Sequence, residues 1–315
     1  MIPFLIRRIV QSAVVVVGVL IITFILIHLL PGSPARAALG PQATPAAIAH
    51  FNQVNGFNLP LPEQFLDYVN RVAHGNLGYS YTNDQTVASL IANRLPKDLV
   101  LIVFSTALAL ALGVPLGIYQ AVKRNSLGDY TLTGVAFILY SMPTFFLAFL
   151  LLAAFAVQFH ILPPEAPQAI GVVGILSHPA GLVLPVVSLA LVSFAAFSRY
   201  MRSSAMDNLV QDYIRTARAK GLSEWTVLVR HLLRNSLIPI VTLLGLSLPA
   251  IVAGAIVVEE VFNYPGMGLL FFDAALKQDY PVLMGFALFV GVATVVGNLL
   301  ADVVYAALDP RIRYD

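Results

Sequence analysis

Six long stretches with almost no charged residue constrain the fold of this 315-residue chain more than any other feature. They span residues 9–30, 99–122, 130–159, 181–197, 238–258 and 281–308. Each reaches or approaches the roughly 20 residues that an α-helix needs to cross about 30 Å of hydrocarbon. Backbone polar groups find no water inside a bilayer, and a helix pairs them internally. The sequence therefore predicts an all-α membrane protein with six transmembrane helices.

The composition excludes an ordinary soluble domain. Charged residues make up 11% of the chain and hydrophobic residues 58%, whereas about 25% charged residues is usual in soluble domains. The absence of cysteine excludes disulfides, thiolate catalysis and cysteine-bound metals. The first apolar stretch, at residues 9–30, is longer than the 7–15 apolar residues typical of a signal peptide. We therefore expect it to stay in the protein as its first helix.

The distribution of Lys and Arg predicts how the six helices are oriented. With both termini in the cytosol, 13 of the 18 basic residues fall in cytosolic segments and 5 fall outside. Cytoplasmic loops of membrane proteins carry such an excess, so we expect cytosolic termini. The chain then divides into residues 1–30 with the first helix, an external segment at 31–98, a five-helix core at 99–308 and a cytosolic tail at 309–315.

One polar segment, residues 199–236, holds seven of the basic residues. A Lys or Arg at the centre of a membrane helix costs about 2.5–3.5 kcal/mol on insertion scales, so we expect this segment in the cytosol. Apolar side chains recur at a spacing of four from Leu209 to Ala217, which indicates a helix. We expect Gly221 to end that helix and Ser223 to cap a second one. A bent helical pair in an apolar protein indicates a docking surface for a soluble partner.

The sequence of residues 212–223, DYIRTARAKGLS, resembles the EAA loop of ABC-transporter inner-membrane permeases. With RHLLRNSLIPIV at 230–241, it resembles the oligopeptide and dipeptide subfamily, also called nickel-type, and the first of its two unlike permease subunits. Arg215 and Thr216 depart from the general pattern, which has Glu and Ala there. In this family the loop inserts into a groove on a cytosolic ATPase. The resemblance implies that contact for Asp212, Tyr213, Arg215, Thr216, Ala217, Arg218, Ala219, Lys220, Gly221, Leu222 and Ser223.

The resemblance also implies a type I ABC importer with several partners. These are a second homologous permease that completes a heterodimer, two ATP-binding domains that are separate or fused, and an extracytoplasmic solute-binding protein. The chain has no G-x-x-x-x-G-K-[ST] sequence, so we expect ATP and Mg on the partner ATPases and no catalysis or cofactor on this chain. The implied location is a bacterial or archaeal cell membrane, with lipid contacts and no nucleic acid.

The external segment, residues 31–98, has modest helical patches at 45–54 and 62–72. Its polar residues and its Gly, Pro and Asn punctuation indicate an aqueous location. Two interpretations stay open for it. It forms either a small cap that contacts the solute-binding protein or a structured linker that packs on the membrane helices.

The second apolar stretch contains a G-x-x-x-G pattern at Gly113 and Gly117. Small residues at this spacing let two membrane helices approach closely. We therefore expect a packing role, and a kink that lines the pathway, at the intervening Pro115, is the alternative.

Four further residues are candidates for the gate or the transport pathway. Pro143 is expected to kink the third helix and to free carbonyl groups inside it. Glu259, at a membrane edge, suits an inter-helix hydrogen bond or a gate contact. Asn298 and Asp302 lie at i and i+4 on one face of the sixth helix. Asp302 either serves the pathway or pairs with a basic residue near the cytosolic end.

Di- or oligopeptides are the predicted substrates, and nickel, glutathione or haem are the alternatives within the same architecture. A more distant alternative is a secondary transporter that needs no ATPase. Such a protein usually shows internal repeats and paired intramembrane charges, and neither is visible in this sequence. An intramembrane enzyme would require polar side chains clustered at membrane depth, whereas the six His are scattered along the chain.

Overall fold

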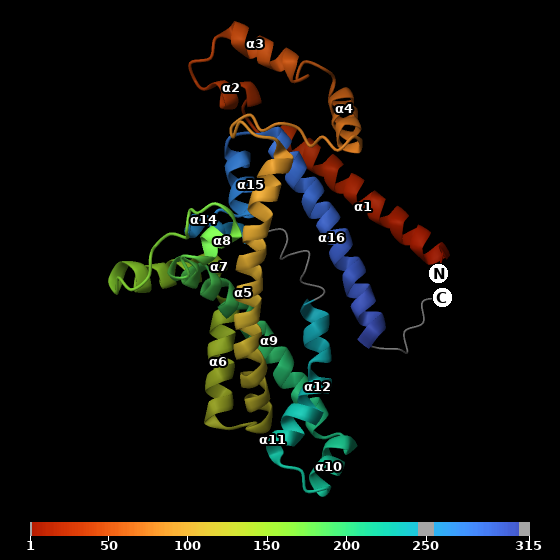
Figure 1. The fold of residues 1–315 in the computed structure, drawn as a ribbon, viewed down its shortest axis with the longest axis vertical. Coiled ribbons are helices and arrows are strands. Elements are labelled where there is room, and N and C mark those ends of the chain that lie inside the picture. Colours follow the sequence, from red (N-terminus) through yellow and green to blue (C-terminus); the bar gives the residue numbers. More distant parts are fainter. Residues whose placement is uncertain (1, 245–254, 309–315) are drawn as a thin grey trace.

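The computed structural model describes residues 2–244 and 255–308, which fold into helices joined by turns (Figure 1). Within these ranges, four helices are long and apolar enough to cross a membrane, or up to six if each of two bent helix pairs is one span. The all-α membrane architecture is confirmed, while six crossings and cytosolic termini stay predictions. Part of the fifth predicted stretch, 238–258, and the tail at 309–315 lie outside the described residues.

Four long helices frame the molecule: α1 (Ile2–Leu29), α5 (Val87–Val122), α9 (Ala180–Leu209) and α16 (Tyr280–Leu308). α5 packs along α9, and α1 packs along α16 (Figure 1). Three of these helices extend well beyond the apolar stretches that predicted them, and α1 begins seven residues before residue 9. α5 begins 12 residues before residue 99, and α9 continues past residue 197 through Arg199 and Arg202.

Two glycines of α5 explain how closely α5 and α9 pack. A Cβ atom added to Gly117 would lie 2.7 Å from both the Met201 Cβ and the Ser198 carbonyl oxygen of α9. One added to Gly113 would lie 3.0 Å from the Phe197 Cβ. The predicted packing role of this glycine pair is confirmed.

The external segment contains three short helices: α2 (Pro34–Leu39), α3 (Pro45–Val54) and α4 (Leu61–Ala73). Both predicted helical patches are confirmed. Thr44 caps α3, because its Oγ1 accepts a hydrogen bond of 3.2 Å from the Ala47 amide. α4 buries Tyr68, whose hydroxyl donates to the Met284 carbonyl of α16 at 3.1 Å. The segment is therefore anchored on the ends of the long helices.

The third apolar stretch forms two helices in place of one kinked helix. α6 (Leu127–Ser141) meets a second helix, α7 (Thr144–Leu151) continued by η1 (Leu152–Gln158), at an angle of 107°. The break falls where Pro143 predicted a kink, because the residue before a proline is driven out of the helical conformation. Met142 accordingly has an extended backbone. The bend predicted at Pro143 is confirmed, although the chain breaks there into two helices and does not continue as one kinked helix.

The remaining helices occupy two opposite regions of the molecule (Figure 1). α8 (Gly171–Leu176), α14 (Ile256–Val261) and α15 (Met267–Leu276) surround the half of α5 nearest the external helices. The polar segment forms α10 (Asp212–Ala219), α11 (Glu224–Thr226), η2 (Val227–Leu232) and α12 (Leu233–Ser236) at the far end. This segment and α2–α4 lie at opposite ends, as the predicted orientation requires.

Candidate functional site

The polar segment forms the bent helical arrangement expected from its sequence, with one difference. α9 ends at Leu209, and α10 begins only at Asp212 after an extended Gln211. The expected continuous helix from Leu209 to Ala217 was therefore wrong at its start. An acidic residue in the first turn stabilises a helix N-terminus, and Asp212 supplies it.

One face of α10 is buried against the rest of the segment. Ile214 and Ala217 pack with Val227 and Leu232 of η2 and with Ala205 of α9. Ile214, Val227 and Leu232 are each fully buried. Burying an Ile or Leu side chain contributes about 1.5–3 kcal/mol, so this small cluster fixes α10 on the end of α9. The opposite face of α10 stays exposed to the solvent.

Gly221 ends α10 in the conformation that glycine favours, with a φ of +76°. Its amide donates to the Arg218 carbonyl at 2.9 Å, and the Leu222 amide donates to the Ala217 carbonyl at 3.4 Å. A Cβ added to Gly221 would meet nothing within 4 Å. The outer side of this turn is therefore open space available to a partner. Ser223 then caps α11 as predicted, accepting from the Thr226 amide at 3.3 Å.

Two exposed ion pairs lie within the polar segment. Arg218 donates two hydrogen bonds of 2.9 and 3.2 Å to the Glu224 carboxylate. Arg215 forms an ion pair of 3.4 Å with Asp212. Exposed pairs of this kind contribute only about 0–1 kcal/mol to stability. They are consequently free to exchange for contacts with a partner. Tyr213 is held on the surface by donating to the Asn208 side chain at 2.6 Å.

The structure adds a residue that the sequence interpretation missed. Trp225, the chain's one tryptophan, is 75% exposed beside the Gly221 turn. Leu222 is also exposed there. Aromatic residues are enriched at the energetic centres of protein interfaces. The signal in the sequence was the position of the chain's one tryptophan, two residues after Ser223 in a polar segment.

Two buried networks hold the base of this segment. Arg202 of α9 donates two hydrogen bonds of 2.8 Å to Asp129 of α6. Beside it, Gln120 of α5 accepts from Ser198 at 2.8 Å and donates to Thr133 at 3.0 Å. The sequence placed Arg202 in a loop, whereas it lies within α9 and joins this helix to α6. Forked pairs of this kind are the strongest ionic contacts in proteins.

Among the pathway candidates, Glu259 has the most organised surroundings. It is buried and accepts a hydrogen bond of 2.9 Å from the Leu269 amide at the start of α15. Asp98 of α5, which the sequence interpretation missed, accepts from the neighbouring Met267 amide at 3.0 and 3.1 Å. A Cβ on Gly266 would collide with both carboxylates. The two acids therefore enclose the N-terminus of α15, where negative charge is favoured.

The other pathway candidates lie apart from one another. Pro143 is exposed at the bend before α7, and α7 packs on α14, the helix of Glu259. Asn298 is exposed on α16 next to Gln11 of α1. The Asp302 side chain lies outside the described residues. Within the described part of the chain, no three His, Asp or Glu side chains converge to hold a metal ion.

Two family profiles match the chain. Residues 113–314 match the binding-protein-dependent transport system inner membrane component, and residues 1–102 match the N-terminal part of that system's membrane component. The chain therefore belongs to the family of binding-protein-dependent transport system inner membrane components, the permeases of ABC importers.

Curated relatives match along their whole length. The oligopeptide transport system permease protein AppB of Bacillus subtilis is 38% identical over 316 residues, covering 100% of both chains. A putative peptide permease of Brucella ovis is 38% identical, covering 99% of both chains. The glutathione transport system permease protein GsiC of Pectobacterium atrosepticum is also 38% identical, with 100% of both chains covered. The inward-facing MetNI methionine ABC transporter matches with a TM-score of 0.49 and 16% identity, covering 70% of this chain and 97% of that chain.

Proposed function

We propose that this permease forms half of the translocation pathway of a peptide importer and receives the force of ATP hydrolysis through α10 and the Gly221 turn. It pairs with a second, homologous permease, and the importer includes two ATP-binding domains and an external solute-binding protein. Its termini face the cytosol of a bacterial or archaeal cell. ATP and Mg bind to the partner ATPases.

The observation that carries this proposal is the construction of the Gly221 turn. Its inner side is fixed to α9 by the Ile214 cluster, and its outer side is open. A partner that inserts there pushes on a rigid element and not on a flexible loop. Such an arrangement suits a coupling element, because a bound ligand shifts a conformational equilibrium only through contacts that differ between two states.

Peptides are the proposed cargo, because relatives of equal identity are named as oligopeptide, peptide and glutathione permeases. Glutathione is itself a tripeptide, and a transporter for it is therefore a special case of the same proposal. Nickel and haem remain alternatives that the cargo of the solute-binding protein distinguishes. Uptake of radiolabelled di-, tri- and oligopeptides, glutathione, nickel and haem by the assembled importer tests this choice.

The substitution Gly221→Trp tests the coupling role. A Cβ at this position meets no atom of this chain within 4 Å, so we expect a bulky side chain there to fill the open space that the ATPase needs. We expect loss of ATPase association and of ATP-driven uptake, while the chain still inserts into the membrane. Co-purification of the ATPases and uptake into proteoliposomes are the two measurements.

Gly75→Trp is a matched control at the opposite end of the molecule. Gly75 has a φ of +77°, close to the +76° of Gly221, and a Cβ there also meets nothing within 4 Å. Both variants carry the same cost, about 1–2 kcal/mol, of placing a non-glycine residue in the left-handed conformation. ATPase binding should therefore survive Gly75→Trp. Equal ATPase binding by the two variants would contradict the coupling role of the Gly221 turn.

A further inference from the structure

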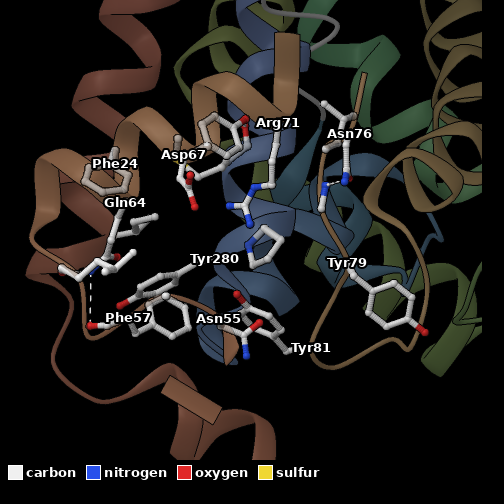
Figure 2. Close-up of a pocket in the computed structure, with 18 of the residues that line it drawn as sticks. Phe24, Asn55, Phe57, Gln64, Asp67, Arg71, Asn76, Tyr79, Tyr81 and Tyr280 are labelled. Atoms are coloured by element: carbon white, nitrogen blue, oxygen red, sulfur yellow. Dashed lines mark hydrogen bonds between the residues drawn. The ribbon is translucent and has the colours of Figure 1, made fainter. Parts of the chain in front are cut away.

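A cavity of about 450 Å³ lies at the external end of the chain. It is enclosed by α4, by the loops on both sides of α4, and by the adjoining ends of α1 and α16 (Figure 2). Cavities of about 300–1,000 Å³ with aromatic walls and a few polar groups are typical of small-ligand sites. The coupling role proposed above makes no use of this cavity.

Aromatic rings that pack against each other form one wall of the cavity. The Phe57 ring packs edge-on against Tyr81 and Tyr280, with ring centroids 6.1 and 5.7 Å apart. The His28 ring lies 5.2 Å from Tyr280, and its Nε2 is 3.2 Å from the Gln64 side chain. Because each ring is held by a neighbour, the wall is formed before any ligand arrives. Such a surface suits an apolar or aromatic group.

Two opposite charges enter the cavity from a single helix. Asp67 and Arg71 stand one turn apart on α4, and Figure 2 shows both side chains directed into the space over Tyr280 and Tyr81. Among the described residues, neither side chain has a hydrogen-bond or ion-pair partner. The guanidinium group of Arg offers a planar fork that fits a carboxylate.

Asp279, the buried acid whose charge reaches Tyr81, makes no ion pair with Arg71 among the described residues. Its Oδ2 accepts from the hydroxyl groups of Ser80 and Thr82, at 2.5 and 2.9 Å, and its buried Oδ1 has no hydrogen-bond partner in the described part of the chain, Arg71 included. Burial, and then the charge of Asp279, raise the pKa of Tyr81 above its usual range. Its hydroxyl group therefore stays neutral and available as a donor at physiological pH. Arg71 is thus the cation of this cavity, and Tyr81 lies within reach of its field.

The geometry points to a site for a short peptide with free termini on the external face of this permease. Its carboxylate pairs with Arg71, its ammonium group with Asp67, and an apolar or aromatic side chain rests on the Phe57, Tyr81 and Tyr280 rings. Residues at i and i+4 are displaced about 6 Å along a helix, and two extended residues span about 7 Å. The two charges therefore match the termini of a dipeptide. The inference rests on the proposed function for the choice of peptides among small zwitterions.

Binding of the dipeptide Ala-Phe to the full-length permease in nanodiscs, without solute-binding protein or ATP, tests the site by calorimetry. Because Arg71 supplies the charged hydrogen-bond donors for the peptide carboxylate, we expect Arg71→Gln to weaken binding tenfold or more. Ala-Phe amide, which lacks the carboxylate, should bind equally weakly to the unaltered chain. Asp67→Asn should weaken Ala-Phe but should leave acetyl-Ala-Phe unchanged.

The external residues Arg36 and Glu63 provide matched controls, since both are exposed and neither lines the cavity. Arg36→Gln and Glu63→Gln should bind Ala-Phe like the unaltered chain. Absence of Ala-Phe binding at millimolar concentration, or equal binding of the peptide and its amide, would overturn the site. Competition by inorganic phosphate as strong as that by the peptide would show a general anion or lipid-headgroup site and overturn the peptide assignment.

This test separates the site from the coupling role. Gly221→Trp should abolish uptake while Ala-Phe binding in the cavity persists. If the proposed importer function is wrong, both the unaltered chain and the Gly221→Trp variant fail in peptide uptake. If only the cavity assignment is wrong, uptake proceeds, and the Arg71→Gln and Arg36→Gln variants bind Ala-Phe equally.

Discussion

Replacing Gly117 by alanine tests how far the contact between α5 and α9 determines stability. The added methyl group would stand 2.7 Å from the Met201 Cβ and the Ser198 carbonyl oxygen, and 3.1 Å from the Arg202 amide nitrogen. Carbon atoms in contact normally keep about 3.5–4.0 Å. The two helices must therefore separate by up to about 1 Å or tilt. Overpacking of this kind costs about 1–3 kcal/mol.

Gly134→Ala on α6 is the matched control, because a Cβ there meets nothing within 4 Å. Both substitutions gain the same helix propensity, about 1 kcal/mol, which cancels in the comparison. We expect Gly117→Ala to have a free energy of unfolding about 1–3 kcal/mol lower than Gly134→Ala. Denaturant unfolding of the two variants in detergent micelles measures this difference. Equal stability would refute the argument that the glycine is required by the close approach of α9.

Two further predictions concern the end of the molecule that carries α10. Asp129→Asn weakens the two hydrogen bonds from Arg202 and is expected to lower the free energy of unfolding by about 1.5–3 kcal/mol. Asp212→Asn is the control, because its partner Arg215 is exposed. We expect Asp212→Asn to change the free energy of unfolding little. The same unfolding experiment measures both variants. Equal losses of unfolding free energy would contradict a stabilising role of the pair between Arg202 and Asp129. The fluorescence of Trp225, exposed in the free chain, should move to shorter wavelengths when tryptophan-free ATPases bind. Unchanged emission in a complex shown to be assembled would place this residue outside the interface.

The features that could be predicted from the sequence depend on neighbouring residues. The apolar stretches, the Thr44–Pro45 start of α3, the Gly221 stop and the Ser223 cap each follow from local rules of backbone conformation and capping. The glycines that face α9 could be predicted because i and i+4 share a helix face. The bent helical pair on either side of Gly221 was therefore predicted from sequence alone, and its contact with an ATPase stays a proposal.

The features that could not be predicted join residues that are distant in the chain. Asp98 and Glu259 meet at the N-terminus of α15, but no local pattern relates position 98 to position 267. The bidentate pair of Arg202 with Asp129 also joins residues far apart in the chain, so no local pattern predicts it. A proline before a helix predicts a break without its angle, so the 107° turn at Pro143 also required the structure.

α9 provides a physical connection between the coupling segment and the region of Glu259. Near one end, Ala205 packs in the cluster that holds α10. Near the other end, Leu189 packs against the cluster that contains Val258 of α14. Beyond Pro185 the helix continues to Leu209 without another proline, a length of about 36 Å at 1.5 Å per residue. An unbroken helix is stiff, so a displacement of α10 reaches α14 without being absorbed in between.

Glu259 follows Val258 directly and holds the start of α15 through the Leu269 amide. We infer that closure of the ATPases, by moving α10, changes the position of α14 relative to Asp98 on α5. The backbone amides at the start of α15 would then hydrogen-bond to the other carboxylate or lose their acceptor. Because each buried amide requires an acceptor, such a contact has a small number of discrete arrangements. That discreteness is the property a gate needs, and the gate contact expected for Glu259 from the sequence stays a proposal.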